Sequence, residues 1–178
     1  MLFPVSLALL TFSSAFLVAK AGFRQKLTCL LALFIISFAQ IVLISQIASL
    51  FNRLNLPFFI ALQALIFILS GLIWWRGGKP NLLGPWRGLK FTFHDFAQFI
   101  KLHPVLGIWL IISVLIYILH AVLILLVPQN NYDSMTYHLS RVAYWIQHKS
   151  LAPWPTPNPR QTTFPINAEL GVLWTVLF

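Results

Sequence analysis

The sequence predicts an all-α polytopic membrane protein with about four complete transmembrane helices, a partial fifth, and a long extracytoplasmic loop containing an amphipathic interfacial helix. The first observation behind this prediction is composition, because 59% of the residues are apolar and 8% are charged, whereas roughly 25% are charged in a soluble domain. The second is a mean hydropathy of +0.83. The third is that four apolar segments approach or exceed the roughly 20 residues that a helix needs to cross a bilayer.

Each of the four apolar segments is expected to form a transmembrane helix. They cover residues 2–19, 27–51, 58–75 and 105–127. The first segment has an alternative, since Ala19-Lys20-Ala21 resembles the cleavage site of a signal peptide. A signal peptide carries basic residues before its apolar core, and this segment has none there. We therefore expect it to remain as a helix.

The basic residues predict the orientation, because Lys and Arg are enriched in cytoplasmic connections. Eight of them follow the first and third spans, in a short connection and in the basic loop 76–104, and four lie in the remaining connections. The eight are Lys20, Arg24, Lys26, Arg76, Lys79, Arg87, Lys90 and Lys101, and the four are Arg53, Arg141, Lys149 and Arg160. The N-terminus and loop 128–167 are therefore expected outside the cytoplasm, at a bacterial inner (plasma) membrane.

The net charge of +9 would suggest a nucleic-acid partner in a soluble protein. Here the basic residues are scattered between apolar runs, which is typical of a topology signal. Membrane lipids are therefore an expected partner, and nucleic acid is not. The single cysteine, Cys29, lies in an apolar run and is expected to be a core residue, since one cysteine forms neither an intramolecular disulfide nor a Cys-based metal cluster.

Two regions of the predicted membrane part carry polar residues. In the cytoplasmic loop 76–104, the basic, aromatic run 91–99 favours a helix in the headgroup layer, with a solvated turn as the alternative. Within the spans, Gln40, Gln63 and His120 are polar exceptions, and Gln46 is another. We expect hydrogen bonds from these side chains to neighbouring helices.

Loop 128–167 is too long for a simple connection and is rich in aromatic residues, so it is expected to be ordered. Its residues 134–149 predict an amphipathic helix that lies on the membrane with its apolar face down. That face is Met135, Leu139, Val142 and Ile146, and a second face is His138, Arg141, Trp145 and His148. The alternating prolines of 151–161 predict an extended strap, and 168–178 would start a further transmembrane helix.

Three ionisable residues in or beside this loop have competing interpretations. Asp133 precedes the predicted helix and is either an N-cap or a catalytic or ligand-binding acid, although Thr136 stands where a capping box needs Glu or Gln. Arg160 ends the strap, where a guanidinium suits a phosphate, or it is a surface or headgroup arginine. Glu169 is expected to interact with the dipole of a helix capped by Asn167.

The loop also resembles a known family. The matching runs are YDSMTYHLSRVAYW (132–145), Pro155-Thr156, Arg160-Gln161 and FPINAEL (164–170). They resemble the N-terminal part of GT-C class membrane glycosyltransferases, the bacterial members related to dolichyl-phosphate-mannose protein mannosyltransferases and lipid A aminoarabinose transferases. The resemblance implies transfer of a sugar from a polyprenyl-phosphate-linked donor to an unknown hydroxyl or amine acceptor outside the cytoplasm, usually with inversion.

The resemblance also implies roles for individual residues. Asp133 would be the general base, and His138 would orient Asp133 or the acceptor. Arg160 or Arg141 would offset the charge of the leaving phosphate, and the matching runs make Tyr137 and Gln161 further substrate-binding candidates. This sequence has Ser134 where the protein mannosyltransferases have a second acid, and with three acidic residues in the whole chain we expect no bound metal and no cofactor.

Two other function classes stay open. The chain could be a non-catalytic membrane subunit or a truncated remnant. It could also be a transporter or lipid flippase, in which His120 and the glutamines of the spans would matter more than the loop. Transporters tend to show internal repeats and spans broken by Gly or Pro, and neither is visible here.

Overall fold

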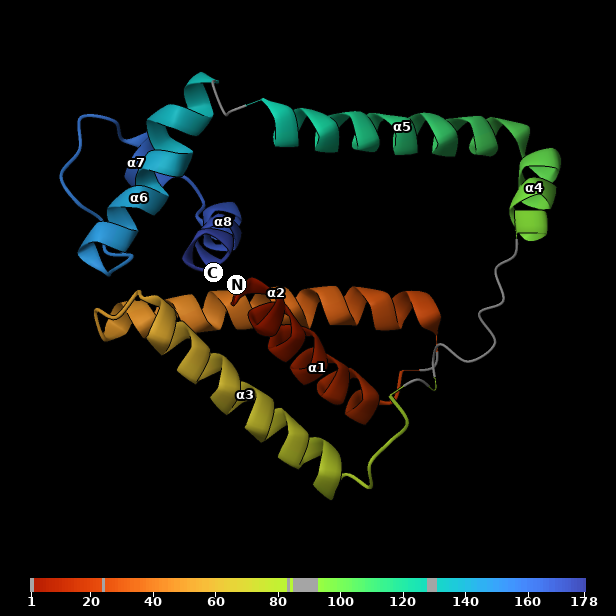
Figure 1. The fold of residues 1–178 in the computed structure, drawn as a ribbon, viewed down its shortest axis with the longest axis horizontal. Coiled ribbons are helices and arrows are strands. Elements are labelled where there is room, and N and C mark those ends of the chain that lie inside the picture. The colour runs from red at the N-terminus through yellow and green to blue at the C-terminus, as the bar shows by residue number, and fades with distance from the viewer. Residues whose placement is uncertain (1, 24, 83, 85–92, 128–130) are drawn as a thin grey trace. The chain divides into compact units, whose positions relative to one another are not determined.

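The computed structural model describes residues 2–23, 25–82, 84, 93–127 and 131–178, and in these residues every regular element is a helix (Figure 1). The chain forms two compact units. The first joins Met1–Trp86 with Asp133–Phe178, and the second is Arg87–Tyr132.

Four helices are long and apolar enough to cross a membrane, which confirms the predicted integral membrane protein. They are α1 (Phe3–Ala21), α2 (Lys26–Leu50) and α3 (Leu56–Arg76) in the first unit, and α5 (Pro104–Leu126) in the second. Each lies within a few residues of a predicted span, because the length of an uninterrupted apolar run is the signal that defines such a helix.

Local sequence explains several helix ends. The Asn55 side chain caps α3 by accepting a hydrogen bond from the backbone N–H of Phe58 at 3.1 Å, and Pro57 follows in the first turn, where its missing N–H costs nothing. Gly22 ends α1 with a φ of +70°, a left-handed conformation that glycine adopts without a steric penalty.

Polar side chains join the three helices of the first unit to one another. Ser13 of α1 donates to Oε1 of Gln40 in α2 at 2.7 Å, and Nε2 of Gln40 donates back to Ser14 at 2.8 Å. Ser6 of α1 donates to Gln63 of α3 at 2.8 Å. The predicted hydrogen bonds from Gln40 and Gln63 to neighbouring helices are confirmed, and α1 is packed as an integral part of the unit.

The Gln40 bonds predict a measurable loss of stability. Replacing Gln40 with Leu removes two interhelical hydrogen bonds, so the free energy of unfolding in detergent should fall by about 1 kcal/mol. The matched control is Gln46→Leu, since Gln46 is exposed on the same helix. Thermal unfolding checks both variants, and equal shifts in Tm would contradict the assigned role of Gln40.

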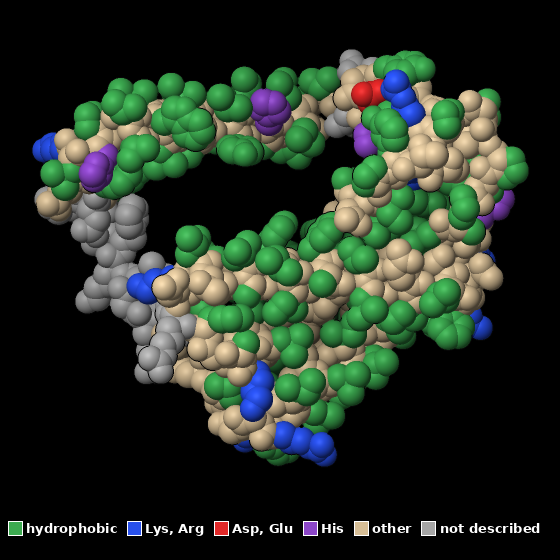
Figure 2. Space-filling model, turned by 180° about the vertical axis from the view of Figure 1, so that it is seen from behind, with side chains coloured by type: hydrophobic (Ala, Val, Ile, Leu, Met, Phe, Trp, Pro, Cys, Tyr) green, Lys and Arg blue, Asp and Glu red, His purple; other side chains and the backbone are tan. Residues whose placement is uncertain are grey.

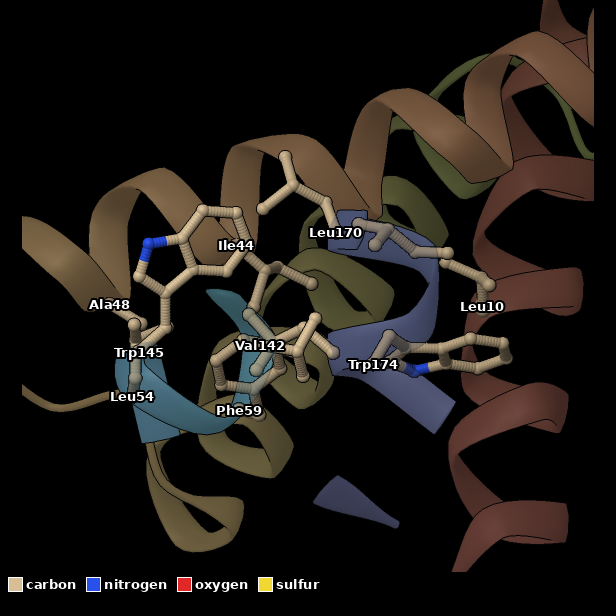
Figure 3. Close-up of a cluster of buried hydrophobic side chains, with 11 residues drawn as sticks. Leu10, Ile44, Ala48, Leu54, Phe59, Val142, Trp145, Leu170 and Trp174 are labelled. Carbon is tan, nitrogen blue, oxygen red and sulfur yellow. The ribbon is translucent and has the colours of Figure 1, made fainter. Parts of the chain in front are cut away.

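The hydrophobic core lies where the loop meets these helices (Figure 3). It takes residues from α1, α2 and α3, and also from α6 (Leu139–His148) and α8 (Asn167–Leu177). Its buried members are Leu10, Ile41, Ile44, Ala48, Leu54, Phe59, Val142, Trp145, Leu170, Leu173 and Trp174. Trp174 also donates its indole N–H to Ser6 at 2.9 Å. The loop is therefore fastened to the membrane helices.

The buried residues of the helix over 134–149 follow the predicted apolar face only in part. Val142 of that face is 3% exposed, but Met135 is 55% exposed, and Trp145, which we assigned to the second face, is 2% exposed. The reason is that α6 packs on the ends of other helices rather than lying freely on lipid: the backbone N–H of Leu54 donates to the carbonyl of Lys149 at 3.2 Å, and that of Leu151 donates to Ser49 Oγ at 2.8 Å. A periodic pattern does not reveal which surface a helix will meet.

The second unit pairs α5 with the short helix α4 (Phe93–Leu102), which covers most of the predicted basic, aromatic helix; residues 85–92 lie outside the described residues. Gly107 lets α4 approach, because a Cβ there would lie 3.0 Å from Ile100. His120 of α5 bonds the carbonyl of Ile116 at 2.8 Å, four residues earlier. This bond lies within α5, and the predicted bond to a neighbouring helix stays a prediction.

Candidate functional site

The candidate site begins at the helix that opens the loop. Residues Ser134–His138 form a π-helical turn, η2, which continues into α6 and ends at Lys149 with a φ of +56°. The predicted helix over 134–149 is therefore confirmed. Asp133 has helical φ and ψ values of −65° and −44° and makes no capping hydrogen bond, so it does not act as the N-cap that one interpretation required.

The π-helical turn changes which residues share a face. At about 100° per residue, an α-helix would place His138 about 140° around the axis from Asp133. Bonding from i to i+5, seen here from the N–H of Leu139 to the carbonyl of Ser134, widens the turn by one residue and brings positions five apart closer to one face. Asp133 and His138 thus lie closer to the same face of the helix than they would in an α-helix. Single π-helical turns are frequent at functional sites.

Asp133 meets Arg160 at the surface. Nη1 of Arg160 lies 3.4 Å from Oδ1 of Asp133, and their side chains are 50% and 57% exposed. Figure 2 shows acidic and basic side chains side by side on the surface. The guanidinium also lies over the rings of Tyr137 and Phe164, at 5.9 and 6.0 Å from their centroids. An exposed ion pair contributes at most about 1 kcal/mol, so a ligand can displace it at little cost.

The strap that carries Arg160 is held at several points. Residues 151–158 have no helix or strand, whereas Arg160 and Gln161, at the end of the predicted strap 151–161, belong to a short helix. Trp154 stacks on Tyr144 of α6 with ring centroids 3.8 Å apart. Oδ1 of Asn158 accepts from the backbone N–H of Arg160 at 3.1 Å, at the start of the short helix α7 (Arg160–Thr163). The position of Arg160 therefore depends on the strap.

Gln161 links the strap to the helix. Its Nε2 donates to the carbonyl of Thr136 at 2.6 Å and to Ser140 Oγ at 3.1 Å, and its Oε1 accepts from Thr156 at 2.7 Å. Both ends of the amide are engaged within the chain. In the structure Gln161 holds the strap against the helix, and its role in substrate binding stays a prediction.

Arg141 is buried below the surface, with 0% of its side chain exposed. Its Nε donates to the carbonyl of Gln161 at 2.8 Å, and its Nη1 donates to the carbonyl of Phe164 at 3.2 Å. Further bonds reach the carbonyls of Pro165 and Arg160. A buried guanidinium bonded in this way does not reach a phosphate at the surface. Of the two arginines expected to meet the leaving phosphate, the accessible one is Arg160.

Glu169 was expected only to interact with a helix dipole, whereas the structure places it in a buried ion pair. Its carboxylate is 2% exposed, and its Oε1 lies 3.1 Å from Nη1 of Arg141 and 2.7 Å from Nδ1 of His138. Its Oε2 is buried without a hydrogen-bond partner among the described residues. Asn167 does not cap the helix as expected, since α8 begins at this residue and has no side-chain cap. A signal existed: an acid next to an apolar run needs a cationic partner if it is buried.

His138 connects this buried group to the surface. Its side chain is 41% exposed, and its ring lies 4.1 Å from that of Tyr137, which is itself buried. Because a carboxylate oxygen accepts, Nδ1 donates to Oε1 of Glu169, and Nε2 takes no part in this bond. In the structure His138 bonds Glu169 rather than Asp133, and its role toward the acceptor stays a prediction.

The arrangement has two layers. A buried layer of Arg141 and Glu169, with the partly buried Gln161 beside it, fixes the backbone. An exposed layer of Asp133, Arg160 and His138 presents a carboxylate, a guanidinium and an imidazole. In the part of the chain that the structure describes, no group of three or more His, Cys, Asp or Glu side chains could hold a metal ion.

Comparisons with protein-family models, with curated proteins and with solved structures found no match.

Proposed function

We propose that the chain is a glycosyltransferase of the GT-C type, or the N-terminal part of one. It would transfer a sugar from a polyprenyl-phosphate-linked donor to a hydroxyl or amine acceptor on the extracytoplasmic face. The observation that carries this proposal is the exposed pair of Asp133 and Arg160, which the fold brings to 3.4 Å although the two residues are 27 positions apart. Such a pair combines a base with a phosphate-binding cation.

The reaction assigns one step to each member of the pair. Asp133 takes the proton of the acceptor hydroxyl or amine as that atom attacks the anomeric carbon of the donor sugar. The bond from the anomeric carbon to the phosphate oxygen breaks, and its electron pair stays on that oxygen. Arg160 hydrogen-bonds the departing polyprenyl phosphate and offsets its charge. Attack opposite to the leaving group inverts the anomeric configuration.

The weakness of the ion pair suits this role. Both side chains are about half exposed, so separating them costs at most about 1 kcal/mol. An incoming phosphate can take the guanidinium from Asp133 and leave its carboxylate free to accept a proton. The rings of Tyr137 and Phe164 below the guanidinium would keep Arg160 in place during this exchange.

His138 is the third group of the proposed site. With Nδ1 held by Glu169, its Nε2 is a candidate to hydrogen-bond the acceptor or the donor phosphate. Glu169 and Arg141 then act through His138 and the backbone rather than on the substrate. A non-catalytic subunit or a transporter would not require an exposed carboxylate, imidazole and guanidinium in the same part of the loop.

The proposed orientation can be tested with engineered cysteines. Lys149→Cys in the loop should react with a membrane-impermeant maleimide in intact cells, whereas Lys79→Cys, after α3, should react only after lysis. Both positions are exposed in the structure, and the native Cys29 is buried and should stay silent. Labelling of Lys79→Cys in intact cells together with protection of Lys149→Cys would reverse the proposed orientation.

The proposed activity is tested by following the donor. Membranes that contain the protein should release polyprenyl phosphate from a radiolabelled polyprenyl-phosphate sugar, and membranes from cells without it should not. A transporter or flippase would move the donor across the bilayer without breaking its bond to the sugar.

A further inference from the structure

A hollow between α1 and α3 lies apart from the candidate site. Its volume is about 380 Å³, and its lining is almost wholly apolar, with Phe16 from α1 facing Phe67, Gly71 and Trp75 of α3. Gly71 shapes it: a Cβ at this position would lie 3.7 Å from the ring of Phe16, so there is room for a side chain where the sequence provides none.

The walls of the hollow are fixed by aromatic contacts. The ring of Phe16 lies 5.6 Å from that of Phe67 and 5.2 Å from that of Trp74, centroid to centroid. Trp74 is held in turn, because its indole N–H donates to the carbonyl of Pro80 at 2.8 Å. The hollow is therefore formed before anything binds in it.

One basic side chain lines the hollow, and two more lie in the last turns of α1 and α3. Lys79 lines it, with its ammonium nitrogen 5.2 Å from the centroid of the Trp75 ring. The Lys20 side chain lies against Gly77, where a Cβ would fall 2.6 Å from its Nζ, and Arg76 is the last residue of α3. All three cations are exposed, and among the described residues none of them has an acidic partner.

We propose that this hollow is a binding site for an anionic phospholipid. One acyl chain lies in the apolar hollow beside Gly71, and the headgroup phosphate meets Lys20, Arg76 and Lys79 at the ends of α1 and α3. A phospholipid has an apolar acyl chain next to an anionic headgroup. The hollow correspondingly has an apolar lining next to basic residues. The anionic headgroups of a membrane surface attract basic residues placed next to a transmembrane helix. This site is independent of the proposed transferase activity.

A second copy of the chain fits the hollow less well. The whole chain has three acidic residues against twelve basic ones. Of these, Glu169 is buried and Asp133 is already paired with Arg160. A docked copy would therefore bring further positive charge to the three cations, whereas a lipid phosphate brings the charge that they need.

Native mass spectrometry of the detergent-solubilised chain tests the proposal. Phosphatidylglycerol and phosphatidylcholine with identical acyl chains are titrated in turn, and the dissociation constants are compared. We expect phosphatidylglycerol to bind at least about tenfold tighter, and this comparison on the wild-type chain needs no variant. The double variant Lys20→Gln/Lys79→Gln should remove most of the difference, and the control Lys149→Gln should keep it.

A second variant tests the hollow itself. Gly71→Leu fills it and should weaken the binding of both lipids, whereas Arg53→Gln, at another exposed cation, should change neither. Equal affinity of the wild-type chain for the two lipids would overturn the proposal. Competition by free glycerophosphoglycerol at the affinity of the intact lipid would also overturn it, because this would show a site for the anion alone. A dimer in detergent that Gly71→Leu converts to a monomer would overturn it as well.

Discussion

Asp133→Asn should lower the rate of sugar transfer by about a thousandfold, within the range of general acid–base catalysis. Asparagine keeps the size of the side chain but does not accept the proton of the acceptor. The fold should survive, because Asp133 is 57% exposed and its ion pair with Arg160 contributes at most about 1 kcal/mol. The measurement is the initial rate at saturating donor, with the Tm recorded on the same preparation.

The matched control for this variant is Asp95→Asn, which removes an acid from helix α4 of the other unit and should leave the rate unchanged. Arg160→Gln separates the two roles further: it should raise the donor concentration needed for half-maximal rate as well as lower the rate, because Arg160 is proposed to hold the phosphate. An Asp133→Asn protein with the wild-type rate would remove Asp133 from the chemistry.

Arg141→Ala should produce the largest loss of stability, about 3–5 kcal/mol, which is the cost of leaving one member of a buried ion pair uncompensated. The substitution removes the guanidinium from Glu169, which keeps only its bond with His138, and removes the donors of four backbone carbonyls in the loop. A typical domain has a free energy of unfolding of about 5–15 kcal/mol, so the loop should lose its structure in this variant.

Limited proteolysis and thermal unfolding measure this effect. Residues 151–163 of the loop should become accessible to the protease in Arg141→Ala. They should stay protected in the control Arg53→Ala, which removes an exposed arginine. Surface substitutions of this kind usually change stability by less than about 0.5 kcal/mol. If Arg141→Ala keeps the wild-type Tm and its protected loop, the buried layer does not hold the site together.

The membrane helices could be predicted because their signal is local. Each of the four depends on an apolar run of sufficient length, and helix ends such as Asn55 and Gly22 follow capping rules that act over a few residues. The bonds of Gln40 and Gln63 were also predictable, since an amide within a span needs a partner from another helix. The length of the apolar runs is sufficient for the first inference, and the cost of burying an unpaired amide is sufficient for the second.

The interior of the loop could not be predicted in this way. The contact of Arg141 with Glu169 joins residues 28 positions apart, and no periodic pattern specifies such a pair. The same applies to Trp145, which is buried because α6 meets the ends of α2 and α3. Sequence reasoning selected Asp133, Arg160 and His138 by chemical type, but the fold decided that Arg141 is buried and that Glu169 holds His138.

The π-helical turn is the least predictable feature of the site. Nothing in the run from Ser134 to His138 marks it, because the apolar spacing fits an α-helix equally well. The turn nevertheless decides whether Asp133 and His138 lie near one face. The residues of the site were therefore visible in the sequence, and their arrangement was not.

The most direct test of the central claim is the fate of the donor phosphate. A set of polyprenyl-phosphate sugars, radiolabelled in the phosphate, is incubated with membranes that contain the wild-type chain, Asp133→Asn or no protein. The account predicts free polyprenyl phosphate from one of these donors with the wild-type chain, in equal amount to the glycosylated acceptor, and almost none from Asp133→Asn. Equal release from all three membranes, or intact donor throughout, would contradict it.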